Sequence, residues 1–83
     1  MNSSNLAGNE FYLPAILNVS IDEEAMEVFL SDGRSLKVPL GWYPRLANAT
    51  KALLKNFEIS PGGYGIHWPE IDEDLSVKGF LLP

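Results

Sequence analysis

The alternating segment at residues 26–38 is the feature that most restricts how this chain can fold. Apolar and polar residues alternate on both sides of a glycine-containing turn, the pattern of two half-buried strands. A two-residue loop would place Val28 opposite Lys37 and would mix the buried and exposed faces. A three-residue loop, residues 31–33, places Val28 opposite Leu36. The segment therefore predicts an antiparallel hairpin with a single register.

The residues of the turn support that loop length. Gly33 ends the loop, where a type I turn followed by a G1 bulge requires a left-handed backbone. The same register sets Met26 opposite Val38 on the apolar face. It also sets Glu27 opposite Lys37, an opposite-charge pair on the solvent face.

A strand is also predicted before the hairpin, at residues 15–21. Leu17, Val19 and Ile21 alternate there with polar residues and are expected to face the core. An acidic turn at residues 22–24 joins this strand to the hairpin.

A helical segment follows the hairpin. Trp42, Leu46, Ala49 and Leu53 have the spacing of one helix face, so all four are expected to face the core. Thr50 is a good N-cap residue, so the segment is expected to break there, with a second short helix following.

Two short strands and a short helix are predicted in the second half of the chain. Strands are predicted at residues 57–59 and 64–68, and a short helix at residues 77–82 with Ser76 as its N-cap. Strands grouped before helices indicate an α+β fold, here a small antiparallel sheet of about five short strands with two short helical segments. Residues 1–10 are expected to be a flexible polar tail and residues 11–83 a single domain.

Charge and composition exclude several classes of function. Six Lys and Arg residues stand against eleven Asp and Glu, a net charge of −5, which argues against nucleic acid and favours a basic protein as partner. The chain has no cysteine, which excludes thiolate metal sites and fits a cytoplasmic protein. We expect neither a membrane span nor a signal peptide, because no apolar run is long enough and the N-terminus lacks a basic start.

Two stretches carry a resemblance to a known family. They comprise the hairpin with the segment after it and a longer acidic stretch: Leu30–Arg34, Val38–Leu40 and Trp42–Leu46, then Gly65–Val77. Together they resemble the bacterial family called domain of unknown function 2442. The resemblance implies a small α+β domain without an assigned activity. It also implies a gene that often lies beside that of another small protein, in some members as a toxin–antitoxin-like pair.

His67 is the only histidine and is the residue around which an enzyme could be imagined. With Glu70, Asp72 and Asp74 it could form a metal-dependent or acid–base site. One histidine without a second nitrogen or sulfur ligand is a poor transition-metal site, however, and no nucleophile motif surrounds the serines. We therefore expect a non-enzymatic protein without cofactor or metal, with His67 at the surface.

Glu70, Asp72, Glu73 and Asp74 place four carboxylates within five residues. The segment lacks the central glycine and the distal glutamate of a calcium loop. Two interpretations remain open: the acids favour the start of the last helix through its dipole, or they form an acidic docking surface.

The function predicted from these features is that of a small cytoplasmic protein-interaction module. Its candidate interaction surface comprises two residues of the helical segment, the histidine and the acidic run: Tyr43, Arg45, His67, Glu70, Asp72, Glu73 and Asp74. The expected partner is a small, possibly basic, protein, and a homo-oligomer is compatible with the sequence. The alternative is a homodimeric regulator or antitoxin that binds nucleic acid weakly through Arg34, Lys37 and Arg45.

Overall fold

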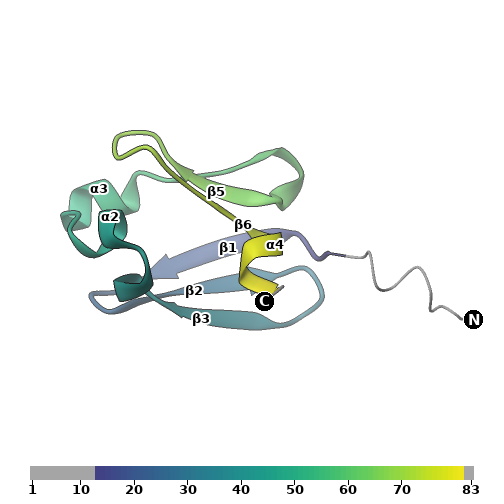
Figure 1. Ribbon diagram of the computed structural model, residues 1–83. Coiled ribbons are helices and arrows are strands. Elements are labelled where there is room, and N and C mark those ends of the chain that lie inside the picture. The colour runs from purple at the N-terminus through teal and green to yellow at the C-terminus, as the bar shows by residue number, and fades with distance from the viewer. Residues whose placement is uncertain (1–12, 82–83) are drawn as a thin grey trace, which may run out of the picture.

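The computed structural model describes residues 13–81 as two small antiparallel sheets with short helices at their ends (Figure 1). The first sheet has the order β1-β2-β3 and the second the order β4-β5-β6. The strands are β1 (Ile16–Ile21), β2 (Ala25–Leu30), β3 (Ser35–Pro39), β4 (Glu58–Ile59), β5 (Gly65–Trp68) and β6 (Glu73–Ser76). The helical segments are η1 (Leu40–Trp42), α2 (Pro44–Ala47), α3 (Lys51–Lys55), η2 (Pro61–Gly63) and α4 (Val77–Leu81). The predicted α+β class is confirmed, with six strands in two sheets. The expected tail at residues 1–10 lies outside the described residues.

The predicted register of the β2–β3 hairpin is confirmed. Val28 pairs with Leu36, and Glu27 pairs with Lys37 on the other face. Gly33 has a φ of 93°, and its N–H donates to the carbonyl of Leu30 at 3.1 Å. The hairpin therefore closes through the three-residue loop that its alternation requires.

Replacing Gly33 with alanine is expected to lower the free energy of unfolding by about 1 kcal/mol, because a Cβ is strained at positive φ. No atom lies within 4 Å of the added Cβ, so this backbone strain would be the only cost. Urea unfolding of both proteins measures the difference. A change below about 0.3 kcal/mol would contradict the strained conformation.

The inward face of β1 differs from the prediction at Leu17. The strand carries a bulge between Ile16 and Asn18, and Leu17 is 64% exposed. Because the bulge adds one residue, Ile16 takes the core position and Val19 remains buried.

The single helix face predicted from Trp42 onward is wrong. Trp42 is 70% exposed, because η1 ends there and Tyr43 adopts an extended conformation before α2 begins. Of the four residues predicted to form one helix face, only Leu46 is fully buried. Leu54 takes the core position that was expected of Leu53. The predicted break is confirmed, since the Thr50 hydroxyl accepts the N–H of Leu53 at 3.2 Å and caps α3.

The acidic stretch contains a strand that the sequence did not predict. Residues of β6 pair with β5, with Trp68 opposite Glu73 and His67 opposite Asp74. The cap of the last helix is confirmed, because the Ser76 hydroxyl accepts the N–H of Gly79 at 3.0 Å. The predicted final residue of that helix, Leu82, lies outside the described residues.

Trp68 is the largest side chain of the core between the two sheets. It is 0% exposed, its indole Nε1 donates to the carbonyl of Leu54 at 3.0 Å, and its ring lies 6.1 Å from that of Phe57. The two halves of the chain also meet where η2 approaches β1. They lie so close there that a Cβ on Gly63 would be 2.9 Å from the Ile16 nitrogen. Side chains from both sheets therefore form one core. No helix within residues 13–81 is long and apolar enough to cross a membrane.

Candidate functional site

Strand β6 divides the predicted interaction residues between its two faces. Glu73 lies opposite Trp68 and shares its inward face, whereas Asp74 lies opposite His67 on the outward face. The acids therefore do not start the last helix as one interpretation expected, since two of them lie in a strand that precedes it.

The inward face brings Tyr43, Arg45 and Glu73 together. Arg45 Nη1 donates to the backbone carbonyl of Asp72 at 2.6 Å and lies 3.7 Å from Glu73 Oε1. The Glu73 side chain is only 18% exposed. Burial, and secondarily the Glu73 carboxylate, raise the pKa of Tyr43. Tyr43, which the sequence placed on the candidate interaction surface, is half-buried, because its side chain packs against the core.

The outward face carries His67 and Asp74 as a pair. His67 Nδ1 lies 2.6 Å from Asp74 Oδ1, and both side chains are accessible to solvent. The hydroxyls of Ser35 and Ser60 donate elsewhere, to Glu27 and to the Gly65 carbonyl. Residues 13–81 contain no group of three or more side chains placed to hold a metal ion. The described geometry gives His67 an aspartate partner and no hydrogen-bonded serine.

Glu70 lies in the connection between β5 and β6 and contacts the end of α3. The Asn56 amide donates to Glu70 Oε1 at 2.7 Å. The acidic segment at residues 70–74 is thus held by Asn56, Arg45 and His67, while the side chains of Glu70, Asp72 and Asp74 remain exposed. Four of the seven predicted residues lie on this segment, Arg45 and His67 contact it, and Tyr43 packs against the core.

Two of the three basic residues of the nucleic-acid alternative, Arg34 and Arg45, lie beyond opposite ends of β3. Arg34 precedes β3 and pairs with Asp32 at 2.8 Å, whereas Arg45 follows β3 and contacts the β5–β6 connection. Lys37, the third, lies within β3 opposite Glu27. Nothing in this geometry favours a continuous phosphate-binding face.

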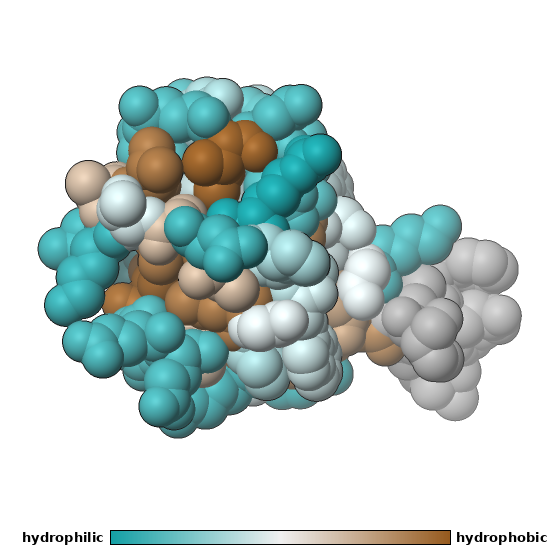
Figure 2. All heavy atoms as spheres, turned by 60° about the vertical axis from the view of Figure 1, so that its left-hand side comes forward, coloured by the Kyte–Doolittle hydropathy of each residue, from teal (hydrophilic) through white to brown (hydrophobic). Residues whose placement is uncertain are grey.

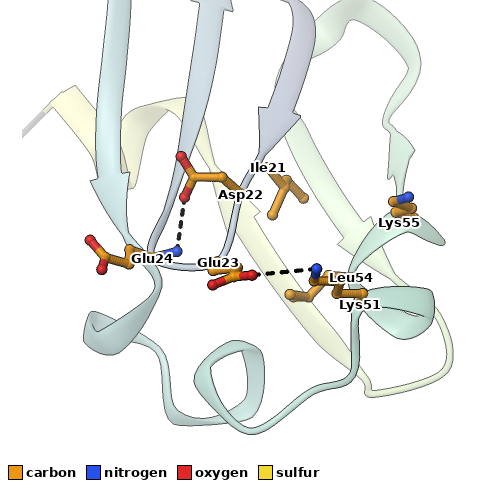
Figure 3. A pocket seen from close by; sticks show the side chains of 7 residues that line it. All are labelled: Ile21, Asp22, Glu23, Glu24, Lys51, Leu54 and Lys55. Carbon is orange, nitrogen blue, oxygen red and sulfur yellow. Dashed lines mark hydrogen bonds and ion pairs between the residues drawn. The ribbon is translucent and has the colours of Figure 1, made fainter.

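A cleft that the sequence did not predict lies between the β1–β2 turn and α3 (Figure 3). Its volume is about 560 Å³. It is lined by Ile21, Asp22, Glu23, Glu24, Lys51, Leu54 and Lys55. The only sequence signals for it are the acidic turn and two lysines four residues apart on one helix face. Their approach depends on how the two halves of the chain pack.

The walls of the cleft carry opposite charges. Glu23 Oε1 lies 3.4 Å from Lys51 Nζ across the opening, and the Ile21 and Leu54 side chains lie between turn and helix (Figure 3). The end of the molecule that carries α2 and α3 shows apolar surface among hydrophilic side chains (Figure 2). Two apolar and five charged residues line the cleft, so it is more polar than the usual small-molecule pocket.

Comparisons with known proteins place the chain among uncharacterised relatives. Residues 16–83 match the model of a family described as protein of unknown function (DUF2442). The fold is similar to the crystal structure of a protein of unknown function from Rhodospirillum rubrum, with 30% identity, a TM-score of 0.72, and coverage of 82% of this chain and 84% of that one. It is also similar to the solution structure of an uncharacterized protein from Chromobacterium violaceum, with 26% identity, a TM-score of 0.68, and coverage of 98% and 84%. No curated protein matches the chain.

Proposed function

Because this chain belongs to the DUF2442 family, whose description assigns no activity, we propose a function from its surface. The domain is a non-enzymatic interaction module that docks a small basic protein. Its docking surface is the acidic segment, residues 70–74, with Arg45 and His67 as the side chains that hold it in place. A partner of this size fits the toxin–antitoxin-like gene pairs that the family resemblance implies.

The observation that carries the proposal is that this acidic segment is ordered by contacts that leave the carboxylates of Glu70, Asp72 and Asp74 exposed. Asp74 is 72% exposed while it accepts from His67, and the Asp72 backbone is held by Arg45. A surface fixed before binding loses less conformational entropy when a partner docks. Fixed carboxylates on a chain of charge −5 also accelerate the approach of a basic protein.

The proposal is tested by isolating the partner and measuring association rates. Tagged chain is incubated with lysate of the native cells, and a stoichiometric partner is identified and purified. The association rate is expected to fall when salt rises from about 0.01 M to about 0.15 M, because the screening length shortens from ~30 Å to ~8 Å. Asp72→Asn with Asp74→Asn is expected to lower the rate roughly threefold at low salt.

A matched control removes the same charge elsewhere. Glu24→Gln with Glu27→Gln changes the net charge equally, at positions in the β1–β2 turn and in β2. This control is expected to lower the rate less than the Asp72 and Asp74 changes. Equal rates for the two variants, or a partner without a basic surface, would refute the acidic docking surface.

A further inference from the structure

We propose that the partner adds an extended segment of its own to the outer edge of β6, with an arginine or lysine opposite Asp74. The inference rests on the proposed function for the location of the contact and for the basic class of partner. It goes further by naming the mode of contact, which is strand addition through backbone hydrogen bonds, and the residue pattern of the segment that binds.

The hydrogen-bond pattern of β6 leaves the backbone of Asp74 free on the outer edge of its sheet. β6 is the last strand in the order β4-β5-β6, so only one of its sides is paired. The Val77 N–H donates to the Tyr64 carbonyl at 2.9 Å, which fixes the phase of the alternating ladder. Glu73 and Leu75 therefore bond to β5, whereas the N–H and C=O groups of Asp74 point away from it. Across the described part of the chain, no other backbone group bonds to them.

The other three sheet edges carry features that hinder strand addition. Because the Leu40 N–H donates to the Glu24 carbonyl, the outward groups of β3 include those of Pro39, which has no N–H. β1 is bulged, and the Asn18 Oδ1 accepts the Val19 N–H at 2.9 Å. β4 has only two residues, whereas β6 has four and is protected by charge alone.

The charges beside the β6 edge select a basic segment. Of the described Lys and Arg side chains, only that of Arg45 pairs with residues 70–74, which carry four carboxylates. A second copy of the chain would place Asp74 against an acidic residue, which disfavours self-pairing through β6. A cation opposite Asp74, which is 72% exposed, would form a cross-strand pair of opposite charge. The His67 contact comes from β5, on the other side of the strand, and leaves this edge free.

The neighbours of Asp74 predict the residues beside that cation. Leu75 faces inward and packs against the core, yet it is only half-buried. A β-branched residue beside Leu75 would cover apolar surface that solvent now reaches. β-Branched residues on both sides of the cation also favour the extended conformation that strand addition requires.

Nuclear magnetic resonance of the full ¹⁵N-labelled chain tests the proposal with the probe acetyl-Thr-Val-Arg-Val-Thr-amide. The probe is expected to shift the amide signals of residues 73–76, most strongly that of Asp74, whose N–H gains an acceptor. The signals of β1 and β3 are expected to remain unmoved. A probe that shifts no signal of β6 would overturn the proposal.

Two N-methylated forms of the probe separate backbone pairing from charge. A methyl group on the arginine nitrogen replaces the N–H that would donate to the Asp74 carbonyl, and this form is expected to bind about tenfold more weakly. A methyl group on the nitrogen of the second valine replaces an N–H that points away from β6, and this form is expected to bind within about twofold of the probe. Both forms keep every side chain and charge, so equal binding would overturn strand addition.

A single change in the chain tests the choice of a cation. Asp74→Asn is expected to weaken binding of the probe about threefold to fivefold, the worth of an exposed ion pair. Glu24→Gln removes one carboxylate from the β1–β2 turn and is expected to leave binding within about twofold of the unaltered chain. If the two variants bind the probe equally, the cation opposite Asp74 is overturned.

This proposal and the proposed function fail in different experiments. If the two N-methylated peptides bind equally while the Asp72→Asn, Asp74→Asn variant still associates slowly with a basic partner, strand addition fails and the docking surface at residues 70–74 stands. If the N-methyl contrast is observed but no basic protein partner is isolated, the proposed function fails and the binding edge of β6 stands.

Discussion

Replacing Trp68 with alanine is expected to lower the free energy of unfolding by about 3–5 kcal/mol, the usual cost of removing a fully buried aromatic side chain. Trp68 is 0% exposed and packs against Phe57 between the two sheets. Its loss would also leave the Leu54 carbonyl without the indole N–H that donates to it. Because a domain of this size has only about 5–10 kcal/mol of stability, the variant is expected to be near its limit of folding. Urea unfolding followed by far-ultraviolet circular dichroism measures the change.

The second tryptophan supplies the control for this change. Trp42 is 70% exposed, so Trp42→Ala is expected to change the free energy of unfolding by less than about 0.5 kcal/mol. The two variants remove the same atoms from one buried and one exposed position. Equal losses of stability would contradict the burial that the structure assigns to Trp68.

A chain that ends after Ser76 is expected to lose its cooperative unfolding transition. Val77 is 1% exposed, and its N–H donates to the Tyr64 carbonyl at 2.9 Å. Phe80 and Leu81 pack against the core from the same helix. Removing this apolar cover costs several kcal/mol, at roughly 1.5–3 kcal/mol for each fully buried side chain, which is comparable with the whole stability of a small domain.

Thermal unfolding monitored by circular dichroism tests the truncation. A chain that ends after Leu81 is the control, because it keeps all of α4 and is expected to unfold cooperatively. If the shorter chain melted with the same midpoint and steepness as the control, α4 would not contribute to the core.

The sequence predicted the β2–β3 hairpin and the Thr50 cap, both of which depend on residues close together in the chain. The β2–β3 register followed from alternation on both strands and from the turn glycine, because only one loop length aligns Val28 with Leu36. The Thr50 cap was likewise set within one turn of helix. Predictions that continued a hydrophobic period across an interruption of the strand or helix were wrong. Leu17 lies at a bulge that has no distinct sequence signal. The extended residue between Trp42 and Leu46 is Tyr43, and the proline that follows it disfavours a helical conformation there.

The candidate site was predictable in composition but not in arrangement. The acidic residues were identified, yet Asp and Glu are poor strand formers, so β6 was missed until its pairing with β5 was visible. The contact of Arg45 with Asp72 joins residues 27 positions apart. The cleft depends in the same way on the approach of α3 to the β1–β2 turn. Contacts of this kind come from tertiary packing, which periodicity does not encode.

The order of strands in the two sheets has a consequence for how quickly the chain reaches its native state. Every strand pairs with its neighbour in the sequence, so each sheet closes only short loops as it forms. Proteins dominated by such local contacts refold in about milliseconds, whereas sandwiches that pair distant strands take up to seconds. The remaining step is the packing of the two sheets against each other. They meet where η2 contacts β1 and around Trp68. We therefore expect this encounter, rather than strand pairing, to limit the folding rate.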